Sequence, residues 1–158
     1  MFRAVSIFLT AIALLGAGVA GAAEVALTIG KVGRGAQTDL TLSDLSALGE
    51  VTIVTGNDFV DGQRNFRGPL MRDLLQHYGA GGAEKVRLTA VNDYHVDVAV
   101  SEFYAYDVIL ALTVDGKPLS RRDRGPIWLI YPTDDHQELQ DPVYNGRLIW
   151  QLVKVEFW

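Results

Sequence analysis

Cysteine does not occur in this 158-residue chain, and histidine and methionine are scarce, with three and two residues. A chain without cysteine contains no disulfide, so its stability has to come from an apolar core. A chain of this length is large enough to build such a core as one domain. Hydrophobic residues make up 49% of the sequence, which is ordinary for a globular protein. The composition therefore predicts one compact domain without disulfides.

Positive charge is also in deficit. The chain has 14 lysines and arginines against 19 aspartates and glutamates, which gives a net charge of -5. Proteins that bind nucleic acids usually present a basic face, so this balance predicts no nucleic-acid partner. The run Arg121-Arg122-Asp123-Arg124 is short and of mixed sign, and we interpret it as a solvated turn.

Motifs for metal binding or catalysis are missing as well. Asp134-Asp135-His136 could supply metal ligands, but His77 and His95 are far away in the sequence and no H-x-x-x-H pattern occurs. Ser101 and Ser120 have no neighbours that would activate a nucleophile. The sequence therefore predicts no metal site and no catalytic residue.

The first 22 residues have the composition of a secretory signal peptide. A short positive start, residues 1–3, precedes an apolar stretch over residues 4–19, and Ala20-Gly21-Ala22 follows the small-x-small cleavage pattern. An uncleaved membrane anchor is the alternative, although the stretch is marginally short for spanning a bilayer. We predict a signal peptide over residues 1–22 and a domain over residues 23–158. The protein would then be periplasmic and would not insert into the membrane after cleavage.

Apolar periodicity predicts many strands and a few short helices. Thr41 and Asp44 fit a capping box before a helix that ends near Gly49. Pro69 opens a second helix that ends at Gly79, because proline is tolerated in a first helical turn. Strands are predicted over residues 24–30, 51–55, 85–91, 94–100, 107–114, 126–131 and 148–157, with one helical turn over 101–106 and a long polar loop over 132–145. This order predicts an α+β fold, a single compact domain that is mostly β with short helices.

Residues 66–75 read F-R-G-P-L-M-R-D-L-L, and five further segments stand out, residues 90–94, 108–111, 115–119, 125–132 and 147–152. In this order the segments resemble the sulfite-oxidase-like family, whose members carry an oxidoreductase molybdopterin-binding domain. Residues 66–75 are similar to the family's F-x-G-x-x-L-x-x-L-L element. Together they cover nearly all of the chain after residue 22. The resemblance implies a compact α+β fold whose loops surround a pyranopterin.

One departure from the family concerns the metal. The resemblance implies a cysteine that binds molybdenum near a C-x-G-N run, and the comparable stretch here is residues 52–57, T-I-V-T-G-N. Gly56 and Asn57 are present, but the thiol is not. A soft, high-valent metal needs a soft thiolate ligand, and a threonine hydroxyl is a poor substitute. We therefore expect a metal-free pterin as the cofactor, without molybdenum.

A pterin is flat and aromatic and carries a donor–acceptor edge, so its site needs a stacking face and polar groups. Trp150 and Tyr131 are candidates for stacking, and Asp93 for accepting hydrogen bonds from the amino edge. Asn57 or Asn92 could give and take hydrogen bonds, and Arg147 could donate to a ring oxygen or an acidic substituent. The predicted pterin site consists of Asn57, Asn92, Asp93, Tyr94, Tyr131, Arg147 and Trp150.

Structural interpretations of these residues stay open. Asn92-Asp93 lies between two predicted strands and is typical of an ordinary turn, because such side chains bond to their own backbone. Trp150 lies in an apolar strand and could belong to the core. Arg147 could be a solvated strand start, and Tyr131 a strand end.

Three functions remain. The first is a non-catalytic pterin-binding protein that regulates a membrane-bound signalling protein, such as a cyclic-di-GMP synthase or phosphodiesterase, in a ligand-dependent way. The resemblance implies this partner, since small members of the family can occur beside such proteins. The second is a molybdopterin-dependent periplasmic oxidoreductase or its accessory subunit. The third is a structural or chaperone-like domain with an empty pocket.

Overall fold

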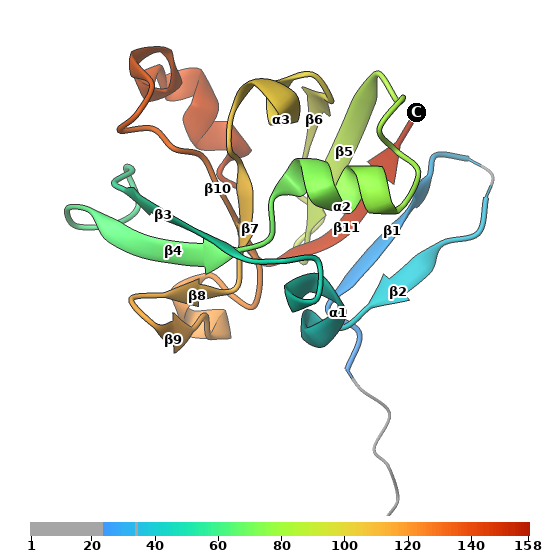
Figure 1. Ribbon diagram of the computed structural model, residues 1–158, viewed down its shortest axis with the longest axis horizontal. Coiled ribbons are helices and arrows are strands. Elements are labelled where there is room, and N and C mark those ends of the chain that lie inside the picture. Colours follow the sequence, from blue (N-terminus) through green and yellow to red (C-terminus); the bar gives the residue numbers. More distant parts are fainter. Residues whose placement is uncertain (1–23, 34) are drawn as a thin grey trace, which may run out of the picture.

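A five-stranded sheet is the frame of the molecule in the computed structural model, which describes residues 24–33 and 35–158 (Figure 1). The predicted signal peptide lies outside the described residues. Across the sheet the strands are β2 (Thr38–Leu40), β1 (Leu27–Lys31), β11 (Leu152–Phe157), β5 (Lys85–Ala90) and β6 (His95–Ala99). β1 and β11 are parallel, and the other neighbours are antiparallel. The parallel pair brings the first and last strands of the domain together.

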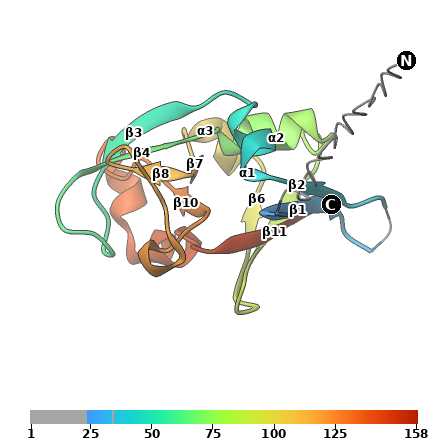
Figure 2. The same cartoon turned by 90° about the horizontal axis from the view of Figure 1, so that it is seen from below.

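Three short helices lie on the same side of this sheet, as Figure 2 shows: α1 (Leu42–Ser46), α2 (Met71–His77) and α3 (Glu102–Ala105). Each helix contributes fully buried side chains, such as Leu45, Leu74 and Phe103, to the core cluster that also contains the inward side chains of the sheet. Burial of aliphatic and aromatic side chains stabilises the domain in the absence of disulfides.

The capping box predicted for α1 is present. The Asp44 amide donates to the Thr41 hydroxyl over 3.1 Å, and the Thr41 amide donates to the Asp44 carboxylate over 2.8 Å. Gly49 follows with a φ of 94°, a conformation that glycine adopts without strain. The sequence therefore predicted the start of this helix correctly, and the helix ends at Ser46, three residues before Gly49.

A second sheet carries the strands nearest the candidate site. Its order is β3 (Val51–Thr55), β4 (Arg64–Gly68), β8 (Thr113–Val114) and β9 (Lys117–Pro118), and β7 (Ile109–Ala111) pairs separately with β10 (Trp128–Ile130). A smaller core cluster, which includes Phe66, Ile109 and Trp128, lies among these strands. β4 passes so close to β7 that a Cβ on Gly68 would lie 1.8 Å from the Leu110 carbonyl oxygen. Only glycine fits at this position.

The α+β class with short helices is confirmed, but some predicted boundaries are wrong. The expected strand over 107–114 is divided between β7 and β8, and the last strand begins at Leu152 rather than at residue 148. The expected loop over 132–145 contains two 3-10 helices, η2 (Gln137–Gln140) and η3 (Pro142–Arg147), and η1 (Arg121–Asp123) lies in the turn before β10. In the described part of the chain, no helix is long and apolar enough to cross a bilayer.

Candidate functional site

Two threonines fasten the loop after β3 to the segment after β10. Thr55 and Thr133 are buried, and their hydroxyl oxygens lie 2.9 Å apart. The Thr133 hydroxyl donates to the Gly56 carbonyl over 2.6 Å, and the Gly56 amide donates to the Asp134 carboxylate over 2.9 Å. These bonds satisfy the buried polar groups and hold Gly56, and with it Asn57, in place.

Asn57 is left with an unused hydrogen-bond donor. Its side-chain oxygen accepts from the Phe59 amide over 2.9 Å, whereas its side-chain nitrogen is buried and makes no hydrogen bond. Asn57 lines a polar pocket of about 420 Å³, together with Gln63, Asp134 and Asn145. A buried amide without a partner destabilises the protein, so an acceptor at this position would be bound favourably.

An aromatic pocket of about 380 Å³ lies next to the polar one. Phe59, Tyr94 and Trp150 line it, and the Trp150 side chain is 38% exposed. The rings of Phe59 and Trp150 meet edge to face, with centroids 5.0 Å apart. Asn145 borders both pockets and donates from its side chain to the Asp58 carboxylate. The volumes are in the range of sites for small organic molecules.

Residues 92–94 form a polar turn, and two of them also line the aromatic pocket. The Asn92 side chain accepts from the Tyr94 amide over 3.2 Å, and Asp93 has a φ of 64°, as expected for a turn. Asn92 and Tyr94 nevertheless line the aromatic pocket, and the Tyr94 hydroxyl donates to the Gly146 carbonyl over 2.9 Å. Asp93 is exposed and lines neither pocket.

Tyr131 lies in the core, contrary to the expectation that its ring offers a stacking surface. Its side chain is fully buried, and its hydroxyl donates to the Glu102 carboxylate over 2.6 Å. Burial, together with the negative charge of Glu102, raises the pKa of the Tyr131 phenol well above its usual value. Tyr131 therefore packs in the core and leaves no ring face exposed for stacking.

Arg147 also interacts with other side chains of the protein. Its guanidinium forms an ion pair with Glu102 and lies 4.7 Å from the centre of the Tyr144 ring. Partial burial lowers the pKa of Arg147, but the Glu102 carboxylate more than offsets this, so the pKa is raised overall. Arg147 lines neither pocket, and its role as a ligand donor stays a prediction.

Arg124 is a cation beside the site that the sequence did not single out. Its guanidinium carbon lies 5.0, 5.6 and 5.9 Å from the ring centres of Trp128, Trp150 and Phe59. Arg124 has a φ of 69°, and its carbonyl accepts from the Gln151 amide over 3.0 Å. Cation–π attraction therefore helps to hold two of the rings that line the aromatic pocket.

The described residues fit a heterocycle better than the metal of the cofactor. Val54 stands where the C-x-G-N pattern has its cysteine, and its side chain is 49% exposed. Among the described residues, no group of three histidine, aspartate or glutamate side chains could hold a metal ion. The thiolate that molybdenum prefers has no counterpart here, whereas the unpaired Asn57 nitrogen and the exposed Trp150 ring suit a flat molecule with acceptor atoms.

Comparison with known proteins agrees with this fold. The model of the oxidoreductase molybdopterin binding domain family matches residues 21–134, so the chain belongs to this family, as its motifs predicted. Among solved structures, the sulfane dehydrogenase SoxCD from Paracoccus pantotrophus is similar, with a TM-score of 0.62 and 12% identity. The match covers 84% of this chain and 37% of that chain, and at this identity it shows the fold alone. A search of curated proteins found no significant match.

Proposed function

We propose that this protein is a non-catalytic pterin-binding protein of the periplasm. It would regulate a membrane-bound signalling protein, such as a cyclic-di-GMP synthase or phosphodiesterase, according to whether a pterin is bound. The observation that carries the proposal is the buried, unpaired side-chain nitrogen of Asn57 in a family member that has no cysteine. Asn57, the asparagine of the family's C-x-G-N run, is present, whereas the cysteine that would bind the metal is absent.

The two neighbouring pockets suggest how the ligand is held. The flat ring stacks on Trp150 in the aromatic pocket, and its polar edge extends past Asn145 towards Asn57. Asn57 donates to a ring nitrogen or to the carbonyl oxygen of the pterin, and Asn92 offers a further amide at the opposite end. Stacking contributes roughly 0.5–1.5 kcal/mol beyond the burial of apolar area.

Native mass spectrometry and metal analysis of one sample test this function. We expect one pterin per chain and no molybdenum, and we expect added pterin to raise the melting temperature by mass action. Stoichiometric molybdenum contradicts the proposal. A protein that carries nothing and is not stabilised by pterins is a structural domain with an empty pocket.

The regulatory role needs a readout in cells. Cyclic-di-GMP should differ between cells that express the parent and cells that express Trp150→Ala, provided that fractionation recovers both proteins from the periplasm. Equal cyclic-di-GMP in the two strains contradicts regulation through this pocket.

A molybdopterin-dependent oxidoreductase, or its accessory subunit, is the second candidate. The family match favours it, because the family model describes an oxidoreductase domain that binds molybdopterin. Molybdenum that stays bound through purification would select this candidate over the first.

A further inference from the structure

The wall of the polar pocket offers more hydrogen-bond acceptors than donors. Three of its amide side chains use their nitrogens within the protein: Gln63 donates to the Asp134 carboxylate over 2.8 Å, Gln140 to the Thr133 carbonyl over 3.3 Å, and Asn145 to the Asp58 carboxylate. Carboxylates and backbone carbonyls accept hydrogen bonds, so each amide has to turn its nitrogen, not its oxygen, to this partner. In the described part of the chain, none of the three amide oxygens accepts a hydrogen bond.

Two carboxylates in the same wall have no cation beside them. Asp58 and Asp134 make no ion pair with any residue that the structure describes, and no described lysine, arginine or histidine lines the polar or the aromatic pocket. Gly56 and Gln63 donate to the same oxygen of Asp134, so its second oxygen is unused among these residues. Both carboxylates can therefore accept charge-assisted hydrogen bonds from a ligand.

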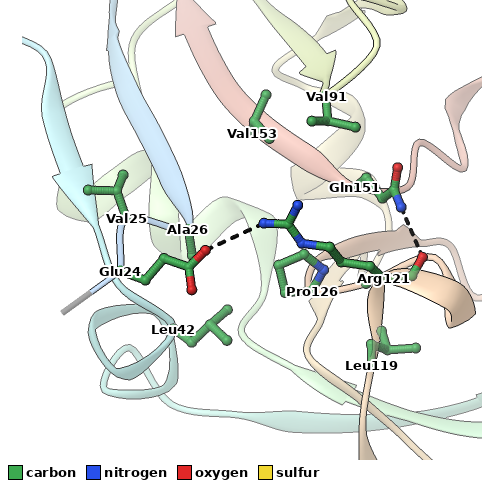
Figure 3. A pocket seen from close by; sticks show the side chains of 11 residues that line it. Glu24, Val25, Ala26, Leu42, Val91, Leu119, Arg121, Pro126, Gln151 and Val153 are labelled. Carbon is green, nitrogen blue, oxygen red and sulfur yellow. Dashed lines mark hydrogen bonds and ion pairs between the residues drawn. The ribbon is translucent and has the colours of Figure 1, made fainter.

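A third cavity, of about 230 Å³, has the opposite arrangement (Figure 3). It lies between the start of β1, α1, η1 and the start of β11, and Glu24 lines it. Figure 3 shows the Arg121 side chain reaching towards Glu24, with the guanidinium 3.4 Å from the carboxylate. The carboxylate of this cavity already has a cation as its partner. The polar pocket is therefore the better of the two for a neutral ligand that donates hydrogen bonds.

Asn57 adds one donor to these acceptors. It lines the polar pocket, and its buried side-chain nitrogen has no hydrogen-bond partner among the described residues. A pterin carries a carbonyl oxygen, a ring N–H group and an amino group in a row along one edge, which is one acceptor followed by donors. One amide nitrogen and two carboxylates are complementary in kind to such an edge.

We propose that Asp58 and Asp134 accept hydrogen bonds from the ring N–H and amino groups of the ligand and make the site selective for this edge. The inference rests on the proposed function and names the residues that decide which heterocycle binds. Lumazine, which has a carbonyl group in place of the amino group of pterin, points an oxygen at the two carboxylates. Acceptors that face each other are left without donors, so the site rejects this analogue.

Fluorescence titration of the purified protein with pterin and with lumazine, at a pH where both compounds are uncharged, tests the selectivity. We expect pterin to bind at least about tenfold more tightly, because lumazine lacks the amino donor. Equal affinities overturn this inference alone, since a pterin still binds as the proposed function requires. Binding of neither compound overturns the proposed function, and this inference with it.

A double variant, Asp58→Asn with Asp134→Asn, tests the two carboxylates. Each asparagine keeps an oxygen for the hydrogen bonds that the carboxylate accepts within the protein, so the variant should fold, which its melting without ligand checks. We expect weaker binding of pterin and a preference over lumazine of less than about threefold, because an amide oxygen is a weaker acceptor than a carboxylate. A preference as large as that of the parent overturns the inference.

Asp61→Asn with Glu84→Gln is the matched control. This variant loses the same number of negative charges, and both residues are exposed and line neither pocket. It should keep the parent's preference for pterin. A control variant that loses the preference shows that the charge of the whole chain decides selectivity, which also overturns the role of Asp58 and Asp134.

Discussion

Asn57 illustrates what a single side chain reveals about a site. An unsatisfied buried donor costs about 1–3 kcal/mol, and proteins usually avoid it. Neighbouring residues do not relieve this cost, since the Asn57 oxygen is the only part of the amide that is bonded among the described residues. A ligand acceptor that meets this nitrogen would recover that free energy.

Trp150 is the residue through which stacking can be tested. In Trp150→Ala the rise in melting temperature with added pterin should be lost or strongly reduced, and the affinity should fall at least about tenfold, because an exposed stacking face is removed. Thermal melts with and without pterin measure the change in melting temperature, and fluorescence titration with a pterin measures the affinity. Trp158→Ala is a matched control, since Trp158 is also 38% exposed but lines neither pocket. Binding by Trp150→Ala as tight as that of the parent contradicts this site.

Three of the seven predicted site residues, Asp93, Tyr131 and Arg147, line neither pocket, for reasons that lie outside local sequence. Glu102 is 45 positions before Arg147 and neutralises it, and the same carboxylate accepts from Tyr131. Asp93 points to solvent because it occupies the turn itself. Sequence patterns identify residue types suited to a ligand but not their intramolecular partners. Arg124 escaped notice for the same reason, since two of its aromatic neighbours, Phe59 and Trp150, are distant in the sequence.

Most helices and strands were predictable where apolar periodicity or capping is strong, as in α1, β3, β5 and β6. The pair Asp115-Gly116 is typical of a two-residue hairpin turn, and β8 and β9 pair across these two residues with positive φ at both. β4 was missed because Asn65 and Arg67 face outwards and, on the other face of the strand, only Phe66 carries an apolar signal. Its conformation depends on pairing with β3 and β8, which local sequence does not encode.

Glu50 connects three of these elements. Its carboxylate accepts from Ser46 at the end of α1 over 2.6 Å and from Arg67 on β4 over 2.7 Å, directly before β3 begins. The Ser46 hydroxyl, followed by the Arg67 guanidinium, lowers the pKa of Glu50 below its usual value. A carboxyl with a lowered pKa in the folded state stabilises the protein above its unfolded pKa of about 4.3. That stabilisation is lost as the pH falls through the lower folded value.

Glu50→Gln should therefore be less stable than the parent at neutral pH, by less than about 1 kcal/mol because Arg67 is largely exposed. The difference should shrink as the pH falls below about 4, where the parent also loses the charge. Urea unfolding at several pH values measures it. Glu84→Gln serves as the control, because no side-chain hydrogen bond or ion pair links Glu84 to the described residues. A difference that is constant with pH contradicts the role of the charge.

For the molecule as a whole, the family and the class of fold were accessible from sequence, because motif order survives where individual residues change. The residues of the candidate site could be predicted from the sequence only in part. Both pockets form where the loop after β3, the tip after β5 and the segment of η3 meet, and these are far apart in the chain. Such convergence depends on how the two sheets pack, not on any single motif.

The hydroxyls of Thr55 and Thr133 join two segments that are 78 positions apart, and residues of both segments line the polar pocket. A ligand that binds this pocket binds the native state alone, so it has to leave before either segment opens. We expect added pterin to slow amide hydrogen exchange in both segments by a similar factor, and exchange mass spectrometry measures it. Unchanged exchange in both segments contradicts binding in this pocket. Two parts of the chain that share a ligand would in this way also share their protection from solvent.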